Sequence, residues 1–379
     1  MNKKLIAIAV AASFAAPMAA QAEPTVYGNL QVEVADIDDG GTKQADADTG
    51  AAGSSYMGTD DNKRGRLGLK GSEDLGGGMS AIYNFEWQVE TTQGQVNDGT
   101  RVGMVGIKAG FGTIMAGSLK TPYKYYGGVK YDPFVTTYLE ARSRGGMSGK
   151  AADAGFSTKG SFGHHGFMTD AIGYKGKFGA VEVWANTSLD EKGGAKGADG
   201  DINAGVKFSG GNFEAFVAMA SNDSVTQGGY DAQDDGTAND AIAGDYSATK
   251  FGGMFKMGPH KIKAQIESTE ATITRVDVGD TGTFATVTGT SGTWESDFIF
   301  LGYEMAMGKN VIVVNYGTRE STSGAYTEDQ DYLAVGVIHK LSKKTRAFVG
   351  YSTSETSDNE VGSKAVDASV TSLGLRVDF

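Results

Sequence analysis

The chain of 379 residues carries a formal net charge of −12 and contains 57 glycines, 5 prolines and no cysteine. The lack of cysteine excludes disulfide bonds, and the negative charge argues against nucleic acid as a partner. After residue 22 there is no run of about 20 apolar residues, so no transmembrane helix is expected. Abundant glycine without collagen periodicity is typical of a chain with many tight turns.

The chain begins with the pattern of an export signal. Two lysines give a positive start, residues 5–16 form an apolar core, and an Ala-x-Ala cleavage site ends at Ala22. The core is too short and too rich in alanine for a membrane anchor. We therefore expect residues 1–22 to be a cleaved signal peptide and residues 23–379 to form one domain. Because the signal holds two lysines and no acid, the mature charge would be −14.

The remaining sequence alternates between apolar and polar residues with a period of two. At the end of the chain Leu373, Leu375 and Val377 share one face with the terminal Phe379, and polar or small residues occupy the other. Such alternation predicts strands with one apolar and one polar face. The predicted strands are 25–35, 63–71, 79–90, 101–109, 112–119, 165–175, 179–189, 201–209, 212–221, 247–257, 260–272, 294–305, 310–319, 331–341, 345–354 and a last strand that ends at 379.

The connections between these strands alternate in length. Short turns occur, for example, at Gly110-Phe111-Gly112 and at Gly210-Gly211. The long connections are at about 36–62, 91–100, 120–164, 190–200, 222–246, 273–293, 320–330 and 355–367. Short turns alternating with long loops, with an even strand count, are typical of bacterial outer-membrane barrels. The predicted fold is therefore all-β: a 16-stranded antiparallel transmembrane β-barrel, wide enough for an aqueous lumen.

The third long connection, at about 120–164, is predicted to be structured. Asp132 and Pro133 match a helix N-cap followed by proline at the first helical position, and Phe134–Arg144 is predicted as a short helix that ends at Gly145. A structured loop of this length normally packs on something, and the nearest cavity is the barrel lumen. We expect this third loop to fold inward; an outward-lying surface loop is the alternative.

Charge is unevenly distributed. The third loop holds seven Lys or Arg and three acids, whereas the loops at 36–62 and 222–246 are acidic. Arg64 and Arg66 alternate with leucines, so they are expected to face the lumen, as is Arg101. An arginine that faced lipid at the membrane midplane would cost about 2–4 kcal/mol. The pattern indicates an acidic vestibule above a basic constriction; ordinary solvated surface is the alternative for the acidic loops.

Four segments match a known family. They are Arg66 to Gly76, Thr100 to Lys108, Leu341 to Thr345 and the terminal Phe379. With them the chain resembles the trimeric general porins of Gram-negative outer membranes over essentially its whole mature length. The resemblance implies a homotrimer in the cell outer membrane. In that family the C-terminal aromatic residue is read by the outer-membrane assembly machinery, so Phe379 is expected to be the assembly signal.

The resemblance also implies a constriction between a basic wall and an inward-folded third loop. Arg66 and Arg101 match the wall, and Asp132 and Glu140 are the best candidates for the opposing acids. The loop lacks the Pro-Glu-Phe-Gly-Gly of enteric members, so the choice between the two acids stays open. The expected constriction residues are Arg64, Arg66, Arg101, Asp132, Glu140 and Arg142.

Other kinds of site find little support. His164 and His165 would point to opposite faces of a strand, and the two remaining histidines lie apart in the sequence. Asp36-x-Asp38 resembles the start of a calcium loop but lacks the glutamate that closes one. We expect no catalytic residue, no metal site and no cofactor. Loose binding of divalent cations at the acidic rim stays open.

The sequence therefore predicts an outer-membrane porin for passive diffusion of small hydrophilic solutes and ions. Its expected partners are those solutes, membrane lipid, lipopolysaccharide, the assembly machinery and two further copies of the chain, with no nucleic acid. A porin selective for an anion such as phosphate is an alternative favoured by the basic third loop, and an adhesin-type structural barrel is another. No enzyme is expected. Ion selectivity stays open because the vestibule and the constriction carry opposite charge.

Overall fold

The computed structural model describes residues 24–38, 56–60, 64–142, 145–147, 166–189, 201–222, 227–230, 240–277, 292–359 and 365–379. The expected signal peptide, Arg144 and the adjacent histidines His164 and His165 lie outside these ranges. Strands make up nearly all of the described chain. Within this part of the chain, no helix is long and apolar enough to cross a membrane.

The strands and helices follow in chain order. They are β1 (Thr25–Asp38), β2 (Tyr56–Asp60), β3 (Gly65–Gly76), β4 (Met79–Glu90), β5 (Gln95–Ala109), β6 (Gly112–Lys120), α2 (Pro122–Tyr125), the 3-10 helix η1 (Gly128–Lys130), β7 (Phe167–Phe178), β8 (Val181–Ser188), β9 (Ile202–Gly210), β10 (Phe213–Asn222), β11 (Gln227–Tyr230), β12 (Asp240–Met257), β13 (His260–Asp277), β14 (Gly292–Met307), β15 (Asn310–Ser323), β16 (Tyr326–Lys340), β17 (Thr345–Asp358) and β18 (Val366–Asp378).

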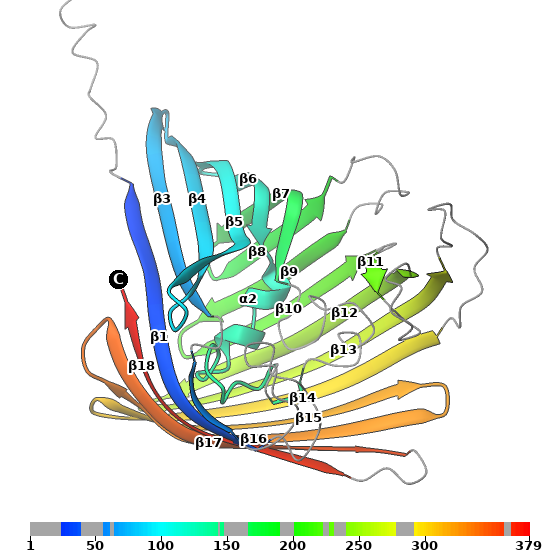
Figure 1. The fold of residues 1–379 in the computed structure, drawn as a ribbon. Coiled ribbons are helices and arrows are strands. Elements are labelled where there is room, and N and C mark those ends of the chain that lie inside the picture. The colour runs from blue at the N-terminus through cyan, green and yellow to red at the C-terminus, as the bar shows by residue number, and fades with distance from the viewer. Residues whose placement is uncertain are drawn as a thin grey trace, which may run out of the picture.

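Sixteen of these strands form the wall of a closed antiparallel barrel (Figure 1). Each wall strand pairs with the next, and the barrel closes because β1 pairs with β18 along one edge and with β3 along the other. The two short strands are additions: β2 continues the pairing along the second half of β1, and β11 pairs with β12. The predicted 16-stranded antiparallel barrel is confirmed.

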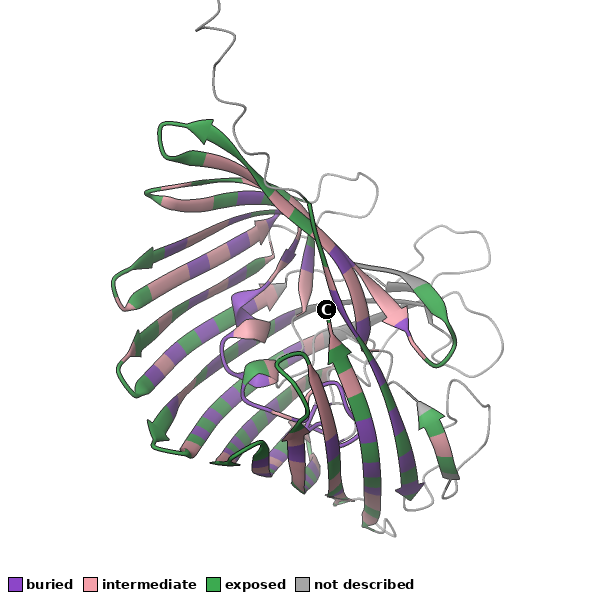
Figure 2. Ribbon diagram, turned by 90° about the vertical axis from the view of Figure 1, so that its left-hand side faces the viewer, coloured by how far each residue is buried: buried purple, intermediate pink, exposed green. Residues whose placement is uncertain are grey.

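The period-two pattern places polar residues inside and apolar residues outside, and Figure 2 shows the corresponding alternation of buried and exposed residues along the strands. On β1, Val32 and Val34 are 38% and 44% exposed, whereas Gln31 and Glu33 are each 1% exposed. An isolated water-soluble protein would not display this many apolar side chains around its circumference. Lipid is the environment that satisfies this outer face.

Several strands are longer than predicted. The connections expected at 91–100 and 320–330 are short, because β5 begins at Gln95 and β15 and β16 turn between Ser323 and Tyr326. These strand ends are rich in Ser, Thr, Asp and Glu, so they lack the apolar alternation of a lipid-facing strand. Cross-strand hydrogen bonds extend these hairpins beyond the part of each strand that alternates between apolar and polar residues. In this extension both faces of the strand can be polar.

The third loop, described at 121–142 and 145–147, lies inside the barrel (Figure 1). The helix predicted at Phe134–Arg144 is wrong over its described part, where residues 134–142 form turns. Thr136 has a φ of 84°, outside the helical region, and its N–H donates to Glu140 Oε2 at 3.2 Å. Thr136 and its two β-branched neighbours are also poor helix formers. The helical turn occurs earlier, at α2, where Thr121 is the N-cap and its side chain accepts a hydrogen bond from Lys124 N–H.

Candidate functional site

The third loop is fixed to the inner wall by hydrogen bonds from strands on several sides. Tyr332 on β16 donates to the carbonyl oxygen of Leu139 at 2.5 Å. Gln31 on β1 donates to the carbonyl oxygen of Thr136 at 2.5 Å. Since Tyr123 at the start of the loop also bonds to β9 and β13, the loop is attached to well-separated strands and crosses the lumen rather than lining one side of it. Any solute that passes through the barrel must pass beside it.

The start of the loop is held by a buried polar cluster around Tyr123. Its backbone N–H donates to Asn203 at 2.9 Å, and its hydroxyl donates to Glu267 at 3.4 Å. Lys250 lies 4.3 Å from the centre of the Tyr123 ring and 3.6 Å from Glu267. Since all of these side chains are buried, the cation–π contact and the ion pair are shielded from solvent, which strengthens them.

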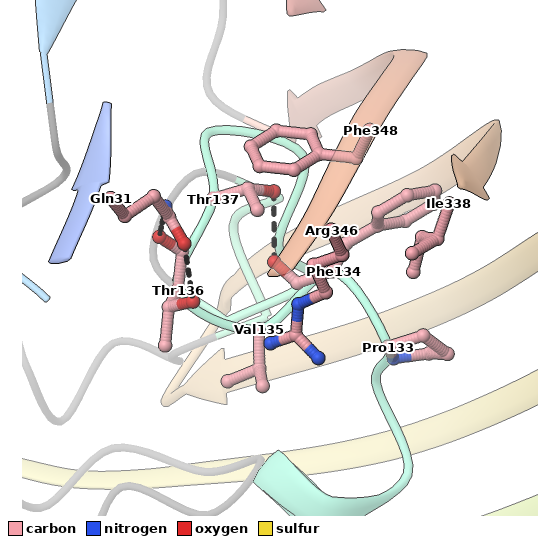
Figure 3. A pocket seen from close by; sticks show the side chains of 9 residues that line it. All are labelled: Gln31, Pro133, Phe134, Val135, Thr136, Thr137, Ile338, Arg346 and Phe348. Atoms are coloured by element: carbon pink, nitrogen blue, oxygen red, sulfur yellow. Dashed lines mark hydrogen bonds between the residues drawn. The ribbon is translucent and has the colours of Figure 1, made fainter. Parts of the chain in front are cut away.

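Aromatic packing completes the attachment. The loop contributes five buried rings, and these pack against rings and aliphatic side chains on the inner wall. The loop rings are Tyr123, Tyr126, Tyr131, Phe134 and Tyr138. Figure 3 shows Phe134 close to Phe348 of β17 and Ile338 of β16, with Gln31 and Thr136 joined by a hydrogen bond nearby. The loop therefore has its own apolar core within the barrel.

Asp132 is a structural residue of the loop and does not contact the arginines. Its carboxylate accepts the N–H groups of Phe134 at 2.8 Å and Ala141 at 2.9 Å. It also accepts the side-chain amide of Asn315 on β15 at 2.8 Å. Burial raises the pKa of Asp132 to about 6, despite these donors. The residue ties two parts of the loop to each other and to the wall.

Glu140, in contrast, lies between two arginines. Arg64 Nη2 is 3.1 Å from one carboxylate oxygen, and Arg142 Nη2 is 3.2 Å from the other. Glu140 is fully buried, so each ion pair is poorly screened. Of the two acids expected to face the basic wall, the structure brings Glu140 to Arg64 and leaves Asp132 apart.

A second buried carboxylate, Glu86 on β4, is not among the residues expected at the constriction. It accepts Arg101 Nε at 2.8 Å and the Tyr27 hydroxyl at 2.9 Å, and Lys120 Nζ lies at 3.4 Å. A sequence signal existed: Glu86 alternates with the apolar Phe85 and with Trp87, so period two places it on the lumen face. The arginine wall thus carries a carboxylate of its own.

Arg66 lies beside Asn29 in the register of β3 with β1. With its amide turned so that the oxygen faces the guanidinium groups, Asn29 accepts Arg66 Nε at 3.0 Å and Arg376 Nη2 at 3.3 Å. Arg376, on β18, also donates to the hydroxyl of Thr136 at 3.0 Å. Arg376 therefore links the wall to the third loop, a role that nothing in its local sequence indicates.

The assembled site has more positive than negative groups. Its cations are Arg64, Arg66, Arg101, Lys120, Arg142 and Arg376, with the amine of Lys124 nearby, and its ion-paired carboxylates are Glu86 and Glu140, with Asp378 beside Arg376. Burial lowers the pKa of Lys124 well below its usual range, and the positive charges of Arg142 and Arg101 lower it further.

Phe379 lies at the seam where the barrel closes. Its N–H donates to the carbonyl oxygen of Gly28 at 3.0 Å, and Gly28 N–H donates back at 3.3 Å. A Cβ atom at residue 28 would lie 2.7 Å from the Phe379 ring, so glycine leaves room for it. Among the residues described, no group of three or more His, Cys, Asp or Glu side chains could hold a metal ion.

Comparison with known proteins gives a consistent result. The model of the family described as Gram-negative porin matches residues 7–359. A major outer membrane protein P.IB of Neisseria gonorrhoeae is 34% identical over 130 residues, which cover 34% of this chain and 34% of that protein. One from Neisseria meningitidis serogroup B is 33% identical over 142 residues, 37% of this chain and 40% of that protein. The alignments thus span little more than a third of these relatives.

Solved structures share the fold at low sequence identity. An anion-selective porin from Comamonas acidovorans is 20% identical with a TM-score of 0.66, over 95% of this chain and 100% of that one. OmpT of Vibrio cholerae, in a trimer form, is 14% identical with a TM-score of 0.64, over 95% and 100%. OmpF of Salmonella typhi, in complex with daunomycin, is 10% identical with a TM-score of 0.60, over 95% and 98%.

Proposed function

Because the chain belongs to the Gram-negative porin family, we propose that it forms a channel through the cell outer membrane for passive diffusion of small hydrophilic solutes and ions. One observation carries the proposal: a closed barrel with an apolar exterior holds a loop across its lumen, beside a cluster of charged side chains. A barrel of this size has space for a water-filled path past such a loop.

The proposed mechanism is sieving by size and charge. The third loop narrows the lumen, so solutes wider than the remaining gap are excluded. Arg64, Arg66 and Arg101 on the wall act with Arg142 and Glu140 on the loop to set the local field, which orders water and favours polar solutes. Asp132 stabilises the loop through hydrogen bonds to its backbone and to Asn315 of the wall. No group on this path needs to be chemically transformed, so we propose no catalytic activity.

A preference for anions is the second proposal, and the excess of cations at the constriction supports it. A narrow lumen with low-dielectric walls focuses the field of charges that line it. Arg142 adds positive charge from the loop side, across Glu140 from Arg64 of the wall. An anion would therefore be stabilised from both sides of the passage, and a small cation would be repelled from both.

The test is planar-bilayer recording of the Arg66→Ser and Arg101→Ser double variant. We expect higher conductance, because two large side chains are removed, and a reversal potential in a salt gradient shifted toward cations. The matched control is Lys108→Ser with Lys256→Ser, which removes the same charge from exposed positions near the turns. Screening over about 8 Å at physiological salt should leave this control close to the unsubstituted protein. Equal shifts in both variants would place the constriction elsewhere.

We also propose that residues 1–22 are removed on export and that residues 23–379 assemble as a homotrimer among lipid and lipopolysaccharide. The resemblance to trimeric porins and the apolar outer face support this proposal. Purified protein should show a β-rich circular-dichroism spectrum and migrate on unheated gels as an oligomer that boiling dissociates. A helical spectrum, or monomer migration before heating, would contradict it.

A further inference from the structure

We propose that Lys340, Arg346 and Arg376 form a second anion-binding station in the lumen, for a small oxyanion with two negative charges. The inference deepens the proposed function and rests on it. The station is separate from the arginines of the constriction: it lies on β16, β17 and β18, next to the short turn between β16 and β17.

Strand register places the three cations side by side. Lys340 is the direct cross-strand partner of Arg346, and Arg346 is the direct partner of Arg376. All three lie on the lumen side of their strands, with Lys340 exposed at the end of β16: Lys340 and Arg346 are two residues from the buried Ile338 and Phe348 respectively, and Arg376 bonds to the loop. Adjacent strands are about 5 Å apart, so the row matches the size of one small oxyanion between neighbouring cations.

The row is only partly neutralised. Arg376 pairs with Asp378 at 2.8 Å. Within the described ranges, neither Lys340 nor Arg346 forms an ion pair with a carboxylate, and the Arg346 guanidinium makes no hydrogen bond. Like charges directly opposite each other on neighbouring strands are destabilising. A bound dianion would offset that repulsion, and the guanidinium would offer it a charge-assisted, bidentate contact.

The third loop packs against this row of cations. Figure 3 shows the Arg346 guanidinium beside Val135 and Thr136, in a pocket that Gln31 also lines. The Thr136 hydroxyl donates to Gln31 at 3.2 Å, and the Thr137 hydroxyl donates to the loop backbone at 2.8 Å. Because these hydroxyl protons are already used, the donors left for an anion in this pocket are those of Arg346, with Lys340 next to it in the row.

The row of Lys340, Arg346 and Arg376 is also connected to the arginines of the constriction. Asn29 accepts hydrogen bonds from Arg66 on one side and Arg376 on the other. Cations therefore follow one another around the wall from β3 across β1 and β18 to β17 and β16. An anion that leaves the Arg66 cluster meets Arg376 two strands away and then Arg346 on the next strand. The arrangement suits stepwise passage toward the mouth at the short-turn end.

The experiment compares the unsubstituted protein with the double variant Lys340→Gln and Arg346→Gln in planar bilayers. Chloride current is recorded while inorganic phosphate, largely a dianion at pH 8, is titrated in. We expect phosphate to reduce the chloride current of the unsubstituted channel. In the double variant we expect the phosphate concentration for half-reduction to rise at least about fivefold, because the charge-assisted contacts are lost.

The matched control is Lys343→Gln with Lys344→Gln, which removes two charges from the exposed β16–β17 turn. It should retain the phosphate response, and heat-modifiable gel migration should show that all three proteins fold. The inference is overturned if phosphate has no effect on the unsubstituted channel, or if the two double variants respond alike. The proposed function fails separately: a folded protein that passes no chloride current without phosphate would overturn both.

Discussion

Asp132 and Glu140 lie in the same loop, and both were candidates to face the arginines, but their surroundings give them different roles. Asp132 accepts three N–H groups and meets no arginine. Glu140 lies between Arg64 and Arg142. Asp132 therefore serves the shape of the loop, whereas Glu140 contributes to the charge of the lumen. The difference follows from which atoms each carboxylate reaches after folding.

The raised pKa of Asp132 predicts a pH dependence of loop stability. The folded pKa is about 6 against an ordinary value of 3.8, so the folded loop binds a proton more tightly than the unfolded chain. The contribution is fully present below about pH 4 and is lost as the pH rises through about 6. We expect hydrogen exchange of loop amides to increase from pH 4 to 7, after correction for the intrinsic exchange rate.

The Asp132→Asn variant should lose this pH dependence and exchange faster throughout. The amide cannot accept hydrogen bonds at both of its polar atoms, so at least one N–H donor loses its partner, at a cost of about 1–3 kcal/mol. The exposed Asp329→Asn serves as control and should behave like the unsubstituted protein. If the pH profile persisted in Asp132→Asn, another group would control it.

The third loop is an element whose conformation is set by contacts rather than by its own sequence. Asp132 and Pro133 favour a helix start, and Asp132 does cap Phe134 N–H. The chain then turns at Thr136, where hydrogen bonds to Gln31 and Arg376 hold a positive φ. Strain in the backbone of a non-glycine residue persists only where the surroundings over-determine it. Here the inner wall of the barrel does so.

The Tyr332→Phe variant tests the attachment of the third loop to the inner wall by removing a single hydroxyl group. The change removes the hydrogen bond to Leu139 and leaves a buried carbonyl oxygen without that donor, at a cost of about 1–3 kcal/mol. We expect normal barrel folding but larger current fluctuations in bilayers, because the loop moves more freely. Tyr316→Phe is the matched control, since that hydroxyl bonds to Asp331 on the exposed face. Equal noise in both variants would exclude Tyr332 as an anchor.

At the scale of the whole molecule, closure of the barrel depends on the two ends of the chain. β1 and β18 pair over ten positions, from Asn29 with Asp378 to Asp38 with Ser369. Phe379 and Gly28 extend this seam by two backbone hydrogen bonds. Closure removes the free strand edges that would otherwise leave backbone groups unpaired in lipid. The last residue therefore belongs to the final strand pairing of the fold.

Substitution of Phe379 separates the seam from the proposed assembly signal. Phe379→Gly keeps the backbone bonds to Gly28 and removes the ring, whereas Phe379→Tyr keeps an aromatic ring. If the ring is read during assembly, Phe379→Gly should accumulate as unassembled periplasmic chains and Phe379→Tyr should reach the outer membrane. Immunoblots of fractionated cells measure both. Normal outer-membrane levels of Phe379→Gly would show that the ring is dispensable.

The barrel follows from the alternation of apolar and polar residues in the sequence. Each residue of a membrane-spanning strand contacts either lipid or the lumen. Alternation with a period of two, from β1 to Val377 and Phe379 at the end of the chain, therefore predicts where the strands are and which residues face outward. The same rule placed Arg66 and Arg101 inside. It failed at polar strand ends such as those near Gln95, because beyond lipid both faces meet water and the alternation disappears.

Which charged side chains form pairs depends on the three-dimensional fold. Glu86 pairs with Arg101, and Arg376 reaches Thr136 across 240 positions of sequence. Such pairs depend on strand register and on the path of the third loop, which is fixed by hydrogen bonds to strands far away in the chain. Periodicity shows the face on which a side chain lies, but not its neighbour on that face. The link from Arg66 through Asn29 to Arg376, in contrast, exists only because the barrel closes.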